Sequence, residues 1–297
     1  MMWNNIDTLD YEGAIYRPPS EAHSIILQVT VGCSHNKCTF CTSFKNKRFR
    51  IKNQDTVVSD LKKAARLYPK NKRLFIADGD ALIMPMHYWQ WLMPAIREHL
   101  PWVERIGVYA TGRAIRKKTV EDLHWLRDYR LGIIYLGVES GDPETLAYVN
   151  KDTTAEQLIE AGQKVKAAGI SLSVTVLLGI APTGRSLAHS QHTGQLLTAM
   201  NPDYVGALSV ILCEGTKLET LVKSGEHHVS TSVEILMELR EMLVHTELSK
   251  GLFMANHASN YLPLKVEMPQ GKTQAINMLD AAINGEVHLR PESLRAL

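Results

Sequence analysis

The chain alternates short apolar, β-rich runs with longer stretches in which apolar positions recur at helical spacing. Apolar runs predict buried strands, and a regular order of strand and helix is typical of a parallel sheet whose strands are joined by helices. The predicted strands are residues 25–31, 73–77, 105–110, 132–138, 171–178 and 204–212. The predicted helices are residues 56–68, 87–99, 120–129, 154–168, 186–200 and 231–248.

Local signals support several of these boundaries. Gly169 follows the last turn of predicted helix 154–168, where glycine commonly ends a helix. Thr154 and Gln157 have the spacing of a capping box at the start of that helix. Pro202 comes just after predicted helix 186–200, which it cannot continue. The pattern therefore predicts an α/β fold of six strand–helix units, either an open (β/α)6 barrel or a doubly wound sheet.

Segments outside the six units divide the chain further. Residues 1–23 precede the first strand and contain the proline-stiffened run Tyr16-Arg17-Pro18-Pro19, which we interpret as an N-terminal extension strapped onto the barrel. Residues 24–248 form the barrel. Residues 249–297, with a helix near 272–284, form a C-terminal cap segment.

Composition narrows the class of protein. Of the 297 residues, 45% are hydrophobic and 22% charged, as in an ordinary globular chain with a sizeable core. A net charge of +2 makes nucleic acid an improbable partner. No run of about 18 apolar residues predicts a membrane span, and the first residues lack the order of a secretory signal. We therefore expect a cytoplasmic protein that does not enter the membrane.

Three of the four cysteines, Cys33, Cys38 and Cys41, fall within nine residues. Three thiolates on one loop can hold three corners of an iron–sulfur cluster and leave the fourth iron open, because Cys213 is distant in sequence. Zinc is an alternative, but a structural zinc site needs four ligands and no second ligand pair follows. A disulfide framework is a weaker alternative, because four cysteines in a chain of this length do not form such a scaffold.

The C-x4-C-x2-C spacing after an apolar strand, with Phe40 before the last cysteine, resembles the loop of the radical S-adenosylmethionine (radical SAM) enzymes. The commoner family spacing is C-x3-C-x2-C, so this loop has one additional residue. The resemblance covers residues 24–220 and is nearest to the Elongator-like and B12-radical-SAM-like branch. It implies a partial (β/α)6 TIM-like barrel, a [4Fe–4S] cluster and S-adenosylmethionine, which the reduced cluster cleaves to a 5′-deoxyadenosyl radical that abstracts hydrogen from a substrate.

The resemblance assigns cofactor-binding roles to residues at the strand ends, where sites of such folds lie. Gly79 and Asp80 occupy the place of the family's Gly-Gly-Glu, which binds the methionine ammonium, although Asp80 is one methylene shorter. Asp78 is the alternative acid. Both acids could instead belong to a solvated turn or to a magnesium site.

Two further strand ends carry similar stretches. Glu139 and Ser140 lie in a run that resembles the family's G-[VIL]-[EQ]-S, which places Glu139 near the cofactor; a structural ion pair is the alternative. Gly179 resembles the segment that packs against adenine. Thr175 shares a strand face with Ser173, so both hydroxyls face either the cavity or the core.

Two residues have competing interpretations as catalytic groups. Cys213 is either a buried small apolar residue, a hydrogen-atom donor, or a distal cluster ligand. His257, in the run Asn256-His257-Ala258-Ser259-Asn260-Tyr261, is either a proton donor across the open side of the barrel or part of a structural cap.

The sequence therefore predicts a radical SAM enzyme acting on a small-molecule substrate, with an electron donor such as flavodoxin or ferredoxin. The chain has neither a cysteine-rich extension for auxiliary clusters nor room for a cobalamin domain, so we expect a minimal catalytic core. The alternatives are a non-catalytic iron–sulfur electron-transfer or sensing protein on the same barrel and a zinc hydrolase. An RNA-modifying role lacks a basic extension to support it.

Overall fold

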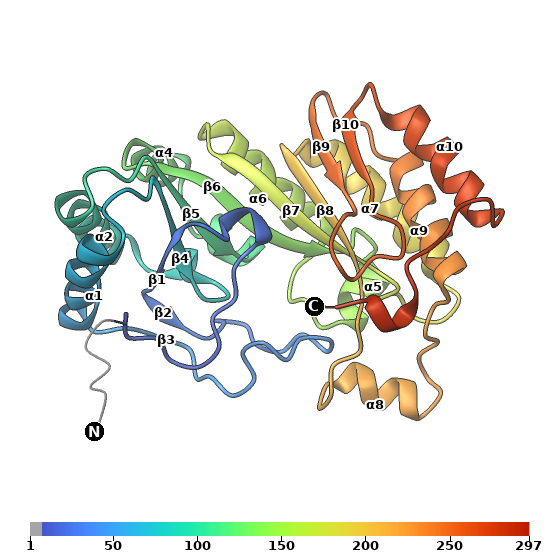
Figure 1. The fold of residues 1–297 in the computed structure, drawn as a ribbon, viewed down its shortest axis with the longest axis horizontal. Coiled ribbons are helices and arrows are strands. Elements are labelled where there is room, and N and C mark those ends of the chain that lie inside the picture. The colour runs from blue at the N-terminus through green and yellow to red at the C-terminus, as the bar shows by residue number, and fades with distance from the viewer. Residues whose placement is uncertain (1–7, 297) are drawn as a thin grey trace. The chain divides into compact units, whose positions relative to one another are not determined.

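In residues 8–296, which the computed structural model describes, most strands belong to one sheet (Figure 1). The strands are β1 (Ile25–Gln28), β2 (Thr30–Val31), β3 (Arg50–Ile51), β4 (Arg73–Ala77), β5 (Arg105–Ala110), β6 (Leu131–Glu139), β7 (Ser171–Leu178), β8 (Tyr204–Ser209), β9 (Gly251–Met254) and β10 (Lys265–Met268). The sheet has the order β1-β4-β5-β6-β7-β8-β9-β10, and β2 pairs separately with β3.

The sheet is mostly parallel, as the alternation of strands and helices predicted. The pairs β1–β4, β4–β5, β7–β8 and β8–β9 are parallel, whereas β9–β10 is antiparallel. The helices are α1 (Gln54–Leu67), α2 (Met86–His99), α3 (Gly112–Arg116), α4 (Val120–Asp128), α5 (Pro143–Tyr148), α6 (Ala155–Ala167), α7 (Ser186–Met200), α8 (Lys217–Lys223), α9 (Ser232–Val244) and α10 (Lys272–Ile283). The predicted α/β class is confirmed.

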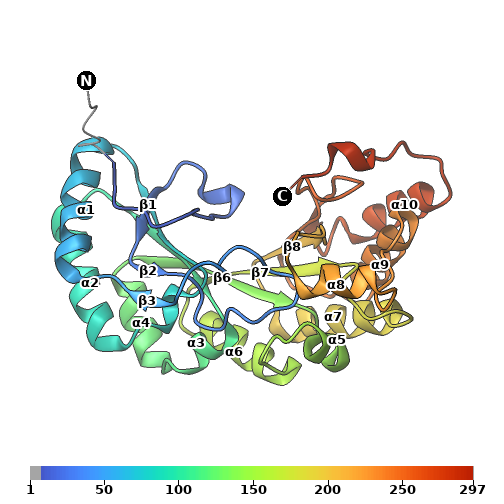
Figure 2. The ribbon, with the colours of Figure 1, turned by 90° about the horizontal axis from the view of Figure 1, so that it is seen from below.

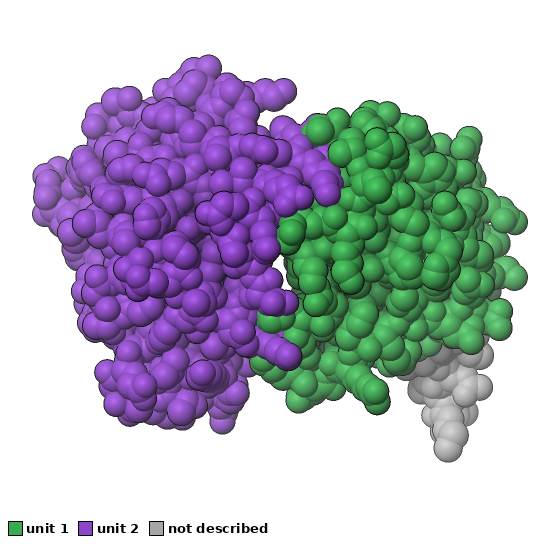
Figure 3. Space-filling view, turned by 180° about the vertical axis from the view of Figure 1, so that it is seen from behind, with its two compact units in different colours: residues 1–36, 43–135, 167–171 green, residues 37–42, 136–166, 172–297 purple. Residues whose placement is uncertain are grey.

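The described chain divides into two compact units (Figure 3). Unit 1 comprises the described part of residues 1–36 together with 43–135 and 167–171. Unit 2 comprises 37–42, 136–166 and residues 172 onwards. Each unit has buried apolar side chains of its own, such as Leu61 and Trp89 in unit 1 and Val174 and Val176 in unit 2.

Helices cover one side of the strands in unit 1. Asn53 caps the start of helix α1, because its side chain accepts a hydrogen bond from the amide of Asp55, and the helix buries Leu61. Helix α2 contributes the fully buried Trp89. Contacts join α1 to α2 and α2 to α4, and Figure 2 shows the three helices lined up beside the strands. Burial of these apolar faces is what fixes the helices on the sheet.

In unit 2, strand β7 alternates between buried and half-buried side chains. Along β7, Val174 and Val176 are buried while Ser173 and Thr175 are half-buried on the other face. Helix α9 packs on both α7 and α10. None of the helices in the described part of the chain is long and apolar enough to cross a membrane.

Several elements differ from the sequence prediction. Predicted strand 25–31 divides into β1 and β2, because Thr30 pairs with Ile51 of β3 rather than with β4. Predicted strand 204–212 ends at Ser209. Two four-residue strands, β9 and β10, were expected only as part of a cap segment; they are too short to show a period and are defined by their partners in the sheet.

The N-terminal extension contacts unit 1 along much of its described length. The hydroxyl of Tyr11 donates to the carbonyl of Ile26 at 2.8 Å, and the amide of Glu12 donates to Gln28 Oε1 at 2.8 Å. Buried Glu21 pairs with Arg105 at the start of β5. The proposed division at residue 23 stays a prediction, and residues 1–7 of the extension lie outside the described residues.

Candidate functional site

The predicted cluster ligands are divided between the two units. Cys33 belongs to unit 1, whereas Cys38 and Cys41 belong to unit 2. All three are half-buried, as is Cys213, and none of these four cysteines is in a disulfide.

Gly79, which follows β4 in unit 1, lies directly against the cysteine loop. Its amide donates to the carbonyl of Gly32 at 3.2 Å. A Cβ atom at this position would come within 2.9 Å of Cys33 Cβ and 2.6 Å of Phe44 Cε2. Only glycine allows so close an approach of backbone to loop. The loop and the end of β4 therefore form one closely packed structure around Cys33.

Asp78 anchors the base of this loop. Its carboxylate, which is fully buried, accepts hydrogen bonds from the amide of Gly32 at 2.7 Å, from Gln28 Nε2 at 3.0 Å and from Lys47 Nζ at 3.1 Å. Buried carboxylates need such partners because burial removes their hydration. Asp78 is therefore a structural residue of the cysteine loop, which the sequence left undecided.

Asp80 ties the same loop to the end of β5. It accepts hydrogen bonds from the hydroxyl of Ser34, from the amide of Thr111 at 2.9 Å and from the hydroxyl of Thr111 at 3.1 Å. Burial raises the pKa of Asp80 to about 6, although the hydrogen bonds from Ser34 and Thr111 act in the opposite direction. The carboxyl group is thus held beside the residue that follows Cys33.

The burial of both acids rules out the solvated-turn alternative, since neither Asp78 nor Asp80 is exposed at all.

In unit 2, Glu139 ends β6 in a left-handed backbone conformation with φ of 64°. Its Oε1 accepts a hydrogen bond from Lys151 Nζ at 2.7 Å, and both side chains are about nine-tenths buried. The pair lies over Gly137, where a Cβ atom would approach Glu139 Oε1 to 2.4 Å. A non-glycine residue in this conformation is strained by roughly 1–2 kcal/mol, and such strain persists where surrounding contacts maintain it.

Ser140 is bonded within the unit. Its buried hydroxyl meets His189 Nδ1 at 2.7 Å and accepts from the amide of Asp142 at 2.9 Å. His189 Nε2 lies 3.0 Å from the carbonyl of Leu177 and 3.4 Å from buried Glu238. Ser140 therefore builds the turn after Glu139, and the sequence did not reveal this partner because His189 lies on a distant helix.

Gly179, at the end of β7, contacts the same network. It has a φ of 73°, and its amide donates to Glu238 Oε1 at 2.6 Å. Glu238 also accepts from the hydroxyl of Ser186, the first residue of α7. No feature of the sequence around Glu238 distinguishes it from a surface acid, so only the structure shows that it supports this strand end.

Asp142 fixes the start of α5. It accepts from the amide of Thr145 at 2.9 Å and forms a two-bond contact with Arg185, with distances of 3.0 Å from Nε and 2.8 Å from Nη2. Burial opposes ionisation of this carboxyl, yet the hydrogen bonds from Arg185 and Thr145 hold its pKa well below the usual range.

Replacing Arg185 by methionine is expected to lower the free energy of unfolding by about 2 kcal/mol at pH 7, because Asp142 would stay buried without its cation. A depressed pKa stabilises the folded state above the unfolded pKa near 3.8, and this stabilisation is lost as the pH falls through the folded pKa. The difference in the free energy of unfolding between wild type and variant should therefore shrink as the pH falls below about 4. Urea unfolding at pH 7 and at a pH below 4 measures this difference.

The matched control for this experiment is Lys223→Met, which removes an exposed partner of Glu219 on α8. Its expected effect is below about 0.5 kcal/mol at either pH, because exposed ion pairs contribute little. Equal losses in the two variants would contradict the structural role of the Asp142–Arg185 pair.

The second part of the cysteine loop, residues 37–42, is hydrogen-bonded to the end of α5 and to α8 in unit 2. The amide of Thr39 donates to the carbonyl of Val149 at 3.1 Å, and its carbonyl accepts from the amide of Leu218 at 3.0 Å. Phe40 packs against the apolar cluster that contains Val149 and Leu218. These contacts hold the segment that carries Cys38 and Cys41.

The three remaining candidates, Thr175, Cys213 and His257, lie in other segments of unit 2. Thr175 is half-buried on the face of β7 that also carries Ser173. Cys213 lies beyond β8, with Sγ 3.5 Å from the carbonyl of Ile211. His257 Nδ1 accepts from the amide of Ser259 at 3.1 Å, which places the proton of the neutral ring on Nε2. Burial, followed by the charge of Arg290, lowers the pKa of His257.

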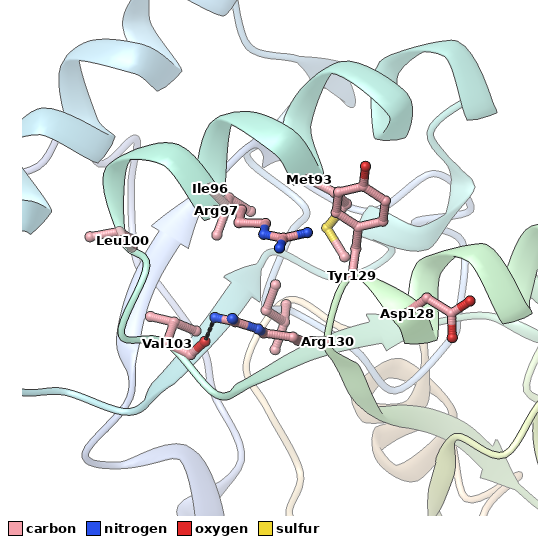
Figure 4. Close-up of a pocket in the computed structure, with 9 residues that line it drawn as sticks. Met93, Ile96, Arg97, Leu100, Val103, Asp128, Tyr129 and Arg130 are labelled. Carbon is pink, nitrogen blue, oxygen red and sulfur yellow. Dashed lines mark hydrogen bonds between the residues drawn. The ribbon is translucent and has the colours of Figure 1, made fainter.

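Two cavities have no cysteine among their lining residues, although the second is lined in part by Gly179. In unit 1, a cavity of about 150 Å³ is lined by Leu100, Val103 and Arg130 at the amino end of β5, the end opposite to Thr111 (Figure 4). Sites of such folds lie at the carboxyl ends of the strands, so this cavity is not assigned to the candidate site. In unit 2, an open groove of about 570 Å³ is lined by the loop after β7 and by α9 and α10.

Comparison with known proteins decides the family. Residues 27–185, more than half of the chain, match the family model described as the radical SAM superfamily. The chain belongs to the radical SAM superfamily. No curated protein matches it.

Solved structures show the same fold at low identity. The chain is similar to methylornithine synthase, with 16% identity and a TM-score of 0.51 over 76% of this chain and 63% of the other. It is similar to coproporphyrinogen III oxidase from Escherichia coli, with 16% identity and a TM-score of 0.56 over 74% and 52%. Elp3 from the archaeon Methanocaldococcus infernus has 14% identity and a TM-score of 0.50 over 74% and 53%. The chain thus spans about half to two thirds of these relatives.

Membership of this radical SAM family implies a [4Fe–4S] cluster and S-adenosylmethionine, and the chain has the cysteines at 33, 38 and 41. The residues present fit a cluster. Cys33, Cys38 and Cys41 are half-buried thiols, Gly79 leaves no side chain beside Cys33, and the buried hydroxyl of Thr39, next to Cys38, has no partner within the described residues.

Proposed function

We propose that this chain is a radical SAM enzyme that acts on a small molecule, with Cys33, Cys38 and Cys41 as cluster ligands. The close packing of Gly79 on Cys33 is the observation that carries the proposal, because it brings the predicted methionine-binding strand end to a cluster ligand. When bound and reduced, the cluster would supply the electron that cleaves S-adenosylmethionine to a 5′-deoxyadenosyl radical.

Asp80 is suited to the methionine ammonium. An ionised carboxylate has about four acceptor positions, and Ser34 and Thr111 together use three of those on Asp80. One position is left for a further donor. A bound ammonium would also favour the ionised form of a carboxyl whose pKa burial has raised to about 6. Gly79 would provide close backbone approach at the same point.

Glu139 is proposed to orient the cofactor, with Lys151 fixing its carboxylate. Thr175 and Gly179 are proposed to line the cofactor region at the end of β7, with Ser140 supporting the turn after Glu139. Cys213 and His257 stay proposals for hydrogen-atom and proton donation; a His257 with a lowered pKa is neutral at pH 7 and would donate from Nε2.

Replacing Glu139 by glutamine is expected to weaken S-adenosylmethionine binding about tenfold, the effect of losing one charged hydrogen bond. Isothermal titration of the anaerobic, cluster-containing protein measures the dissociation constant. Glu144→Gln is the matched control, since Glu144 is an exposed glutamate of the same unit. Equal affinities of the two variants would remove Glu139 from the proposed cofactor site.

Reductive cleavage of the cofactor tests the proposed function itself. The protein is reconstituted with iron and sulfide without oxygen, given S-adenosylmethionine and dithionite, and assayed for 5′-deoxyadenosine. Product formation supports the enzyme. An intact cluster without saturable S-adenosylmethionine binding would instead favour an electron-transfer or sensing protein on the same barrel.

The physiological setting follows from this chemistry. We propose a cytoplasmic enzyme that receives electrons from a small donor such as flavodoxin or ferredoxin. A net charge of +2 supports a small-molecule substrate over nucleic acid.

A further inference from the structure

The hydroxyl of Thr39 is buried without a hydrogen-bond partner. Thr39 is 5% exposed, and its Oγ1 is among four buried side-chain polar atoms that have no partner in the described part of the chain. A buried hydroxyl that has lost water and gained no partner costs about 1–3 kcal/mol. Such an atom in a well-packed segment indicates that a partner outside the polypeptide completes the site.

Two hydrogen bonds within unit 2 hold the backbone of Thr39. Its amide donates to the carbonyl of Val149 at the end of α5, and its carbonyl accepts from Leu218 in the first turn of α8. The side-chain amide of Asn150 adds a hydrogen bond to the carbonyl of Lys37 at 3.1 Å. The amide and the carbonyl of Thr39 are therefore both hydrogen-bonded, and the hydroxyl is its one polar group without a partner in the described residues.

The surroundings of this segment offer few acceptors for the hydroxyl. The adjacent residue Phe40 packs against an apolar cluster of Val149, Ile180 and Leu218. Thr39 directly follows Cys38 and precedes Cys41 by two residues in the same unit. The missing acceptor is thus expected beside two predicted cluster ligands, where a bound cluster brings thiolate and sulfide sulfurs.

We infer that the Thr39 hydroxyl donates a hydrogen bond to a sulfur of the cluster and raises its reduction potential. The inference rests on the proposed cluster ligands. A hydrogen bond to sulfur stabilises the more negatively charged reduced cluster, and such bonds are among the protein's means of setting cluster potentials. Thr39 acts through the cluster sulfur, so it is a positioning and tuning residue.

The test compares Thr39→Val, which removes the hydroxyl and keeps the shape, with Thr39→Ser, which keeps the hydroxyl. Redox titration of the anaerobic, reconstituted protein, monitored by electron paramagnetic resonance without S-adenosylmethionine, measures the midpoint potential. We expect Thr39→Val to lower the ratio of reduced to oxidised cluster about three- to tenfold at a given potential, which for one electron is about 28 to 59 mV. Thr39→Ser should stay near the wild-type value.

Thr246→Val is the matched control, because Thr246 is a buried threonine of unit 2 whose hydroxyl donates to the carbonyl of Met242 at 2.7 Å. It should leave the potential unchanged. Thr39→Ala provides a second variant without the hydroxyl if the valine is not accommodated. Equal potentials in Thr39→Ala or Thr39→Val and the wild type, with full iron content, would overturn the inference but leave the cluster ligands intact. A wild type that binds no iron would instead overturn the proposed function.

Discussion

Replacing Cys38 by alanine is expected to abolish both cluster binding and 5′-deoxyadenosine formation. Three cysteines on one loop leave no spare ligand, and the only other cysteine, Cys213, lies 175 residues further along the chain in sequence. Iron and sulfide content, the absorbance of the cluster and the anaerobic cleavage assay measure the two losses. If circular dichroism shows that the variant without cluster is still folded, the missing cluster ligand and not unfolding accounts for the loss.

The Cys213→Ala variant is the matched control for Cys38→Ala. If Cys213 is not a ligand, the variant should retain the iron content of the wild type, whatever its turnover. Loss of iron on removal of Cys213, with retention on removal of Cys38, would contradict the proposed ligand set. Zinc in place of iron, in protein prepared and analysed without oxygen, would favour the hydrolase alternative.

Replacing Asp78 by alanine is expected to lower the free energy of unfolding by about 3–5 kcal/mol. The change would leave Lys47, whose side chain is about one tenth exposed, without its buried counter-ion, and the amide of Gly32 without an acceptor. Removing one partner of a buried ion pair is costly because the remaining charge stays out of water. Urea unfolding of the protein without cluster measures the loss.

Asp78→Ala should also reduce iron incorporation, because the amide of Gly32 precedes Cys33 and fixes the start of the loop. Glu104→Ala is the matched control: it removes an exposed acid of unit 1 that pairs with exposed Lys72 at 2.7 Å. Its expected cost is below about 1 kcal/mol, with normal iron content. Similar stability in the two variants would show that Asp78 does not anchor the loop.

The fold was predictable where a pattern runs over enough residues. Strand β7 alternates over eight residues, and α7 begins and ends at the predicted residues 186 and 200. The four-residue strands β9 and β10 and the helices α5 and α8, of six and seven residues, carry too few periods to be recognised and were missed. Their formation depends on neighbours: β9 exists because β8 offers a parallel partner.

The candidate site was predictable only in part. Covalent spacing showed that Cys33, Cys38 and Cys41 belong to one loop. The same pattern could not show that Asp78 binds the amide of Gly32 across 46 residues of sequence, or that Ser140 meets His189 across 49 residues. Such partners are set by tertiary contacts, and no local signal distinguishes a buried acid from an exposed one.

The sequence by itself determined the α/β class, the cysteine loop and the location of candidate polar residues at strand ends. These features follow from hydrophobic periodicity and from residue spacing along the chain, which are local properties. The tertiary structure decided which groups each acid binds and which polar atoms have no partner. Asp78 and Asp80 became anchors of the loop, and Thr39 kept an unpartnered hydroxyl beside Cys38, because burial and hydrogen bonding depend on residues that only folding brings together.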